Sequence, residues 1–147
     1  MIRLEPHQNL AWDFDGTLVQ GPNSDLFRTY IAAHPEKRHH VITFRDREWA
    51  SVIHHELGAL GLDPKLIVSV ENCPEPLHDT FQLSRVAGSC ISKAVAARAE
   101  HGFLRWKGHR ARELGCTILV DDMAEWVVTG CQENGVAFLD ANVELVL

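Results

Sequence analysis

The sequence predicts an α/β fold, a three-layer sandwich in which a mainly parallel, five-stranded sheet carries helices on both faces. Short apolar segments of strand length alternate with longer segments of helix length along the 147 residues. Helices placed between strands provide the crossover connections that parallel strands require. The length fits one domain, residues 1–147, with a core of its own.

The expected strands are short, apolar and rich in β-branched residues, as strands buried on both faces are. They are "NLAWD" (9–13), "HVITF" (40–44), "KLIVSVE" (65–71), "TILVD" (117–121) and "VAFLD" (136–140). Asp13, Thr43 and Asp121 lie at or near the carboxyl ends of three of them. Ligands of open parallel sheets bind at that edge, so we expect these side chains to share one crevice.

The expected helices lie between these strands and have recognisable start and stop signals. They cover 22–34, 47–60, 89–102, 107–115 and 123–135. Asn23 or Ser24 is suited to cap the first helix, and Asp46 the second. Glycines at 61, 102, 115 and 135 are suited to end helices. The segment 71–79 contains two prolines and is expected to be a loop.

Charge and cysteine content narrow the functional classes. The formal net charge is −6, which argues against broad nucleic-acid binding and leaves room only for a local basic patch. The four cysteines form no CxxC pair, so reduced thiols are expected. The N-terminus has no apolar signal core, and no stretch has the length of a membrane span. These features predict a cytoplasmic protein with no membrane association.

The stretch "DFDGT" (13–17) places two carboxylates one residue apart, directly after an apolar strand. Residues i and i+2 of an extended chain point the same way, so Asp13 and Asp15 are expected to face one crevice. Two like charges so close need a cation or a shared proton to relieve them. One interpretation is a catalytic pair beside a metal ion. The other is a turn in which both side chains cap local backbone amides.

Further along the chain, "VITF", "RWKGH" and "ILVDD" follow "WDFDGT" in order. Together these four motifs resemble the haloacid dehalogenase (HAD) superfamily of phosphohydrolases, over about residues 9–140. The resemblance implies a Rossmann-like core and a phosphatase that works through an aspartyl-phosphate. The acidic residue at position 15 favours phosphate esters, because the dehalogenases of the family lack it.

The resemblance implies a role for each motif residue. Asp13 is the expected nucleophile, and Asp15 the acid that protonates the leaving oxygen and later activates water. We expect Asp15 to hold its proton at the first step because other carboxylates crowd it. Thr43 and Lys107 are the expected phosphate-binding residues. For the phosphate contact of Lys107, Lys93 and Arg105 remain alternatives.

A Mg²⁺ cofactor is implied in the same way. Its expected ligands are Asp13, the backbone carbonyl of Asp15, and Asp121. Asp122 is either a further ligand or a residue that orients the others. Alternatively, the Asp121–Asp122 pair caps the helix that follows it.

Other residues near these motifs have two interpretations each. Arg45 is expected either to contact the leaving group or a second phosphate, or to form a salt bridge with Asp46 or Glu48. Among Trp49, Trp106 and Trp126, core packing is the better interpretation for at least two.

The spacing of the motifs leaves little room for a cap domain. The segment between Asp15 and Thr43 holds a loop and a helix, and only 72–106 has room for a small helical excursion. An open site suits a phosphorylated small molecule, but it also admits a macromolecular substrate, nucleic acid or phosphoprotein, or is covered by a second subunit in a homo-oligomer. A non-catalytic phosphate-binding module with the same fold is the alternative outside enzymology.

Overall fold

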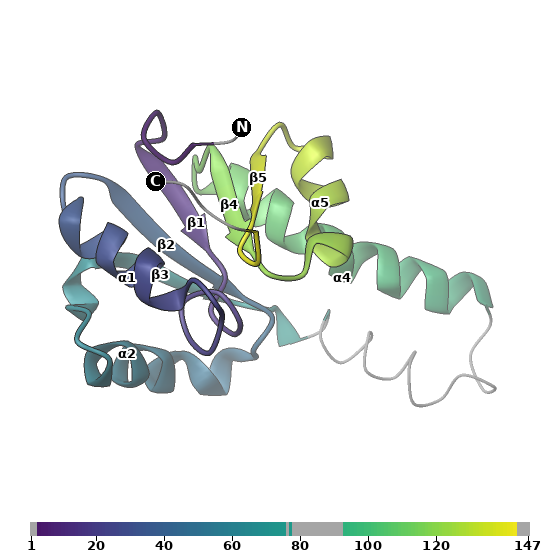
Figure 1. Cartoon of the computed structure of the whole chain (residues 1–147). Helices are drawn as coiled ribbons and strands as arrows, with labels where there is room; N and C mark the ends of the chain where they lie inside the picture. Colours follow the sequence, from purple (N-terminus) through teal and green to yellow (C-terminus); the bar gives the residue numbers. More distant parts are fainter. Residues whose placement is uncertain (1–2, 76, 78–92, 144–147) are drawn as a thin grey trace.

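The computed structural model describes residues 3–75, 77 and 93–143, and these form the expected α/β fold (Figure 1). The strands are β1 (Asn9–Trp12), β2 (Arg38–Thr43), β3 (Ile67–Asn72), β4 (Ile118–Asp121) and β5 (Ala137–Asp140). The helices are α1 (Ser24–Ala33), α2 (Ala50–Ala59), α4 (Lys93–Glu113) and α5 (Ala124–Glu133), with 3₁₀ helices η1 (Arg47–Trp49) and η2 (Pro64–Leu66). The five strands are all parallel, in the order β3-β2-β1-β4-β5.

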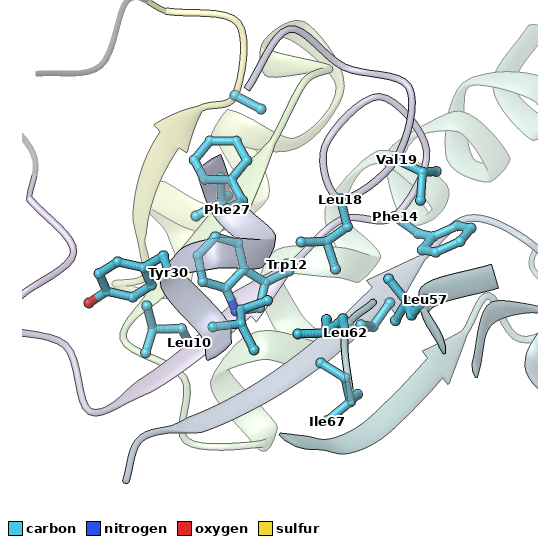
Figure 2. Packing of buried hydrophobic residues seen from close by; sticks show 14 of the residues in the cluster. Leu10, Trp12, Phe14, Leu18, Val19, Phe27, Tyr30, Leu57, Leu62 and Ile67 are labelled. Atoms are coloured by element: carbon cyan, nitrogen blue, oxygen red, sulfur yellow. The ribbon is translucent and has the colours of Figure 1, made fainter. Parts of the chain in front are cut away.

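Each face of the sheet is covered by its own pair of helices. Because successive strand side chains point to opposite faces, Leu10 and Trp12 join the cluster that includes residues of α1 and α2, whereas Ala11 joins the cluster of α4 and α5. Figure 2 shows the first cluster, in which the ring of Trp12 lies close to Phe27, with ring centres 5.6 Å apart. The fold class predicted from the sequence is therefore confirmed.

The strand order creates a crevice between β1 and β4. From β1 the chain proceeds outward to β2 and β3, and it then returns to the other side of β1 to add β4 and β5. The connections on the two sides therefore diverge at the carboxyl ends of β1 and β4. A ligand crevice is expected at such a point, where the strand order reverses.

One prediction about the helices is wrong. The segments 89–102 and 107–115 are not two helices, because a single helix, α4, runs through Gly102. A Cβ atom at Gly102 would lie 3.2 Å from Cδ1 of Leu77, so this glycine serves close packing rather than termination. Residues 89–92 of the expected helix, and residues 76, 78 and 79 of the expected loop 71–79, lie outside the described residues. Glu71 and Asn72, expected in that loop, belong to β3.

The first helix begins where expected, at residues 23–24, but the expected side-chain cap is not formed by Asn23. Asn23 makes no side-chain cap; its amide instead donates to the carbonyl oxygens of Ala141 and Val143, which ties α1 to the segment after β5. Asp46 does cap, accepting from the backbone N–H of Glu48, although the first turn there is the 3₁₀ helix η1. Gly61 and Gly135 follow helix ends with positive φ, as expected.

No separate cap domain is found among the described residues. Between Asp15 and Thr43 they form α1, β2 and connecting turns. The helical excursion predicted within 72–106 lies partly outside the described residues. The next described element after β3 is α4. Within the described part of the chain, no helix combines the length and apolar character needed to cross a bilayer.

Helices α4 and α5 approach each other closely at two glycines. A Cβ atom at Gly108 would lie 2.4 Å from the carbonyl oxygen of Gly130, and one at Gly130 would lie 2.9 Å from Cα of Arg105. Backbone atoms cannot move aside as a flexible side chain can. This contact sets the position of Lys107, the residue before Gly108.

Replacing Gly108 by alanine is therefore expected to destabilise the fold. The added methyl group would push α4 away from α5, at a loss of about 1–3 kcal/mol in the free energy of unfolding measured with urea. Gly58→Ala is the matched control, because Gly58 is exposed in α2 and its nearest neighbour is Cγ of Pro64, 3.7 Å away. That control should gain about 0.5–1 kcal/mol. A Gly108→Ala protein as stable as wild type would contradict the close contact.

Candidate functional site

The expected site residues meet at the crevice between β1 and β4. Asp13 directly follows β1, and its backbone N–H donates to the carbonyl oxygen of Val120. Asp121 is the last residue of β4, the neighbouring strand. Both aspartates are almost fully buried. The sheet itself therefore places two carboxylates side by side at its carboxyl edge.

Lys107 joins these two carboxylates. Its Nζ lies 2.6 Å from Oδ1 of Asp13 and 2.7 Å from Oδ2 of Asp121, and the side chain is 1% exposed. The ring of Phe44 closes one side of the ammonium group, with its centre 4.3 Å from Nζ. The preference for Lys107 over Arg105 is consistent with this geometry, since Arg105 pairs with Glu133. The side chain of Lys93 lies outside the described residues.

Burial dominates the electrostatics of this cluster. It raises the pKa of Asp13 to about 8; Lys107 opposes the rise, and Asp121 and Asp122 add to it. Burial disfavours the charged form of Lys107 too, but Asp121 and Asp13 outweigh that effect and raise the pKa of Lys107 above its usual range. Three carboxylates thus face one ammonium group, and the cluster carries an excess of negative charge.

Asp122 completes the acidic cluster. One carboxylate oxygen from each of Asp13, Asp121 and Asp122 lies within 4.8 Å of the other two. Oδ1 of Asp122 is buried, and it has no hydrogen-bond partner among the described residues. Carboxylate oxygens are the ligands that hard divalent cations prefer. The donor set and the unpaired oxygen fit such an ion.

Gly16 explains how Asp122 reaches this position. A Cβ atom at Gly16 would lie 2.2 Å from Oδ2 of Asp122, and the backbone there has φ +80°. Only glycine adopts this conformation without strain and leaves room for the carboxylate. The glycine of the DFDGT motif is therefore needed both for the turn and for the acidic cluster.

Asp15 lines the same pocket, but its surroundings differ from those expected. Among the described residues its carboxylate does not belong to the cluster of Asp13, Asp121 and Asp122; it forms a bidentate pair with Arg45, with Nε–Oδ2 2.8 Å and Nη2–Oδ1 2.7 Å. Its side chain is half exposed. The predicted crowding is wrong because the chain turns after β1 and carries Asp15 outward, toward the end of β2.

The salt bridges predicted for Arg45 were assigned to the wrong partners. Arg45 pairs with Asp15 rather than with Asp46 or Glu48. Its Nη1 also lies 3.7 Å from Oε1 of Glu56 in α2. Proximity in sequence suggested the nearest acids, but Arg45 follows β2, which is paired with β1, and its guanidinium reaches Asp15 just after β1.

The two threonines of the motifs take different positions. Thr43 is 1% exposed at the end of β2, and its Oγ1 accepts from the backbone N–H of Arg45. Thr17, to which the sequence analysis assigned no role, has its Oγ1 3.3 Å from Oδ2 of Asp13. Its place in DFDGT, four residues after Asp13, is the signal that could have identified it.

The acidic residues accept hydrogen bonds from distant side chains as well as from nearby groups. Oδ1 of Asp121 accepts from the backbone N–H of Met123, the residue before α5, and Oδ2 accepts from Lys107. The metal-ligand role expected of Asp121 stays a prediction. The hydrogen bonds of Asp13 and Asp15 go to the side chains of Lys107, Thr17 and Arg45. This pattern differs from a turn in which both carboxylates cap local amides.

The predicted site residues line one pocket of about 570 Å³. Its inner part contains the acidic cluster, Lys107 and Thr43, and its remaining lining residues are Asp15, Phe44, Arg45, Asp46, Trp49 and Met123. Trp49 is 48% exposed there, whereas Trp106 and Trp126 pack against apolar clusters. Core packing is thus confirmed for two of the three tryptophans.

Comparison with known proteins adds little to this description. No family model matches the chain, and no curated protein matches it. One similar solved structure is that of an uncharacterized protein from Corynebacterium glutamicum, with 19% sequence identity and a TM-score of 0.45. The match covers 90% of this chain and 83% of that one.

Replacing Lys107 by methionine is expected to destabilise the metal-free protein. It would leave buried carboxylates without their cation, which costs about 3–5 kcal/mol for a buried pair that loses one partner. The loss measured by urea unfolding in EDTA should be larger at pH 8.5 than at pH 6, because the raised pKa of Asp13 lets that group bind a proton at the lower pH.

Lys65→Met is the control for this substitution, since Lys65 is exposed in η2. It should change stability by less than about 0.5 kcal/mol at both pH values. Equal stabilities for Lys107→Met and wild type at pH 8.5 would contradict the electrostatic role of Lys107.

Proposed function

We propose that this protein is a Mg²⁺-dependent phosphatase of the HAD type, which hydrolyses a phosphate monoester through an aspartyl-phosphate. The observation that carries the proposal is the buried contact of Lys107 with both Asp13 and Asp121 at the reversal of strand order. These residues come from three of the four motifs on which the family resemblance rests. Burial of a nucleophile beside a fixed ammonium group is the arrangement that phosphoryl transfer needs.

The inner residues supply the nucleophile and the charge. A carboxylate oxygen of Asp13 attacks phosphorus; the Asp13 O–P bond forms, and the bond from phosphorus to the leaving oxygen breaks. Lys107 neutralises charge on Asp13 and on the phosphoryl oxygens, and the Thr43 hydroxyl donates to one of those oxygens. The Thr17 hydroxyl, close to Oδ2 of Asp13, holds the nucleophile in orientation.

Asp15 moves the protons. It gives its proton to the leaving oxygen, and in the second half of the reaction it takes one from the water that attacks phosphorus. The attack breaks the Asp13 O–P bond and releases inorganic phosphate. The bidentate contact with Arg45 occupies both oxygens of Asp15. That contact must open before the first transfer, and the incoming phosphoryl dianion is a competing partner for the guanidinium.

The acidic cluster is suited to hold Mg²⁺. Asp13, Asp121 and Asp122 provide carboxylate oxygens within mutual reach, and the carbonyl of Asp15 is a further candidate ligand. A bound Mg²⁺ supplies positive charge that offsets the acidic cluster and polarises the phosphoryl group.

The proposal is tested by hydrolysis of p-nitrophenyl phosphate. Wild-type protein should turn over with added Mg²⁺ and lose activity in EDTA. Asp13→Asn should lower kcat by roughly 10³-fold or more while the fold is retained, because the nucleophile is lost. Asp25→Asn is the matched control, since Asp25 is exposed on α1 and its loss should leave kcat unchanged.

Asp15→Asn separates the proton role from the nucleophile. Its loss should lower kcat by about 10²–10⁴-fold for an alkyl phosphate, and by less for p-nitrophenyl phosphate, whose leaving group departs readily without a proton. Full activity in Asp13→Asn would exclude the nucleophile assignment. If inorganic phosphate binds but no ester is hydrolysed in the presence of Mg²⁺, the non-catalytic binding module is favoured.

A further inference from the structure

The pocket extends beyond the space that a phosphoryl group needs. Its volume of about 570 Å³ falls within the range of small-molecule sites. The acidic cluster, Lys107 and Thr43 form the inner end, where the proposed chemistry places phosphorus. The outer part, lined by Phe44, Arg45, Asp46, Trp49 and Met123, is therefore left for the leaving group.

Trp49 is an exposed aromatic ring in this outer part. Trp49 is 48% exposed, and it is the one aromatic residue among the exposed large hydrophobic residues of the described chain. Exposed tryptophan presents a flat apolar face to solvent, which a second ring can cover by stacking. In a pocket beside buried catalytic groups, such a face is a candidate contact for substrate.

The segment that carries Trp49 is firmly anchored. Asn72, at the end of β3, donates from its side-chain amide to the carbonyl oxygen of Asp46 at 3.0 Å. The backbone N–H of Cys73 donates to the carbonyl oxygen of Arg45, also at 3.0 Å. Asp46 then caps η1, whose last residue is Trp49. The ring therefore stands on a segment whose backbone carbonyls are hydrogen-bonded to the end of β3 and to the residue after it.

A chain of contacts connects Trp49 to the proton donor. Arg45 bonds to Asp15, and its guanidinium carbon lies 5.6 Å from the centre of the Trp49 ring and 4.8 Å from that of Phe14. In the proposed reaction Asp15 protonates the leaving oxygen, so that oxygen lies next to Asp15. The substituent on the oxygen is then directed toward Arg45 and Trp49.

The charges in this region disfavour a second anionic group on the substrate. Arg45 is the positive group here, and it already faces Asp15 and Glu56, while Asp46 also lines the pocket. In the proposed first step Asp15 holds a proton, so two carboxylates, Asp46 and Glu56, face one guanidinium. The outer part is left negative, and a second phosphate or a carboxylate would be repelled. An uncharged planar group meets no such opposition.

We infer that the substrate is a phosphate monoester whose leaving group carries an uncharged aromatic ring, which stacks on Trp49. The inference rests on the proposed function, since it takes the position of the leaving oxygen from the role of Asp15. It assigns Trp49 as the residue that determines specificity.

The test compares benzyl phosphate with cyclohexylmethyl phosphate. The two esters have the same number of carbon atoms and release alcohols of similar basicity, so they differ chiefly in the flatness and π-system of the ring. Stacking contributes about 0.5–1.5 kcal/mol, which predicts a kcat/KM about 2- to 10-fold higher for benzyl phosphate. Trp49→Ala should bring the ratio close to one by lowering kcat/KM for benzyl phosphate, and Trp49→Phe should retain most of the preference.

Leu60→Ala is the matched control, because Leu60 is an equally exposed apolar residue outside this pocket. It should leave both kcat/KM values unchanged. Benzylphosphonate and cyclohexylmethylphosphonate, which are not hydrolysed, should inhibit in the same order in wild type and lose that order in Trp49→Ala. The inhibition constants report binding without the chemical step.

Two results would overturn the inference, and they differ from each other. Equal kcat/KM for the two esters in wild type, or equal losses for both in Trp49→Ala, removes the stacking role but leaves the phosphatase in place. Absence of turnover with either ester and with p-nitrophenyl phosphate removes the proposed function, and the inference with it.

Discussion

The rest of the site depends on one interaction, the buried contact of the Lys107 ammonium group with the carboxylates of Asp13 and Asp121. It connects α4 to the ends of β1 and β4, so the helix on one face of the sheet is tied to the two strands at the crevice. A buried cation is tolerated only where carboxylates surround it closely. The close approach of α4 and α5 at Gly108 and Gly130 holds the lysine at the required depth.

The site has two zones with different physical character. The inner zone is buried and highly charged; burial raises the pKa of Asp13, and the neighbouring carboxylates raise that of Lys107. The outer zone is partly exposed and is formed mainly by the segment after β2, where Arg45 connects Asp15 to Trp49. Such a division suits a reaction whose charged centre is the same for many substrates while the attached group varies.

The inner zone contains charges that do not stabilise the fold. Asp122 keeps a buried oxygen without a partner among the described residues, and three carboxylates face a single ammonium group. A fold selected for stability alone would pair or remove these charges. The excess of negative charge is understandable if the cluster exists to receive a cation, and it is the kind of local inconsistency expected at functional sites.

The sheet and most of the site residues could be predicted from the amino-acid sequence, because apolar strands and the polar residues at their ends are local patterns. Asp13, Thr43, Lys107, Asp121 and Asp122 were all predicted, and all line the pocket. Three features became apparent only in the folded protein: α4 continues through Gly102, Arg45 pairs with Asp15 rather than with nearby acids, and Trp49 lines the pocket. Each of these depends on distances between segments far apart in the chain, and side-chain partners are chosen by those distances rather than by sequence spacing.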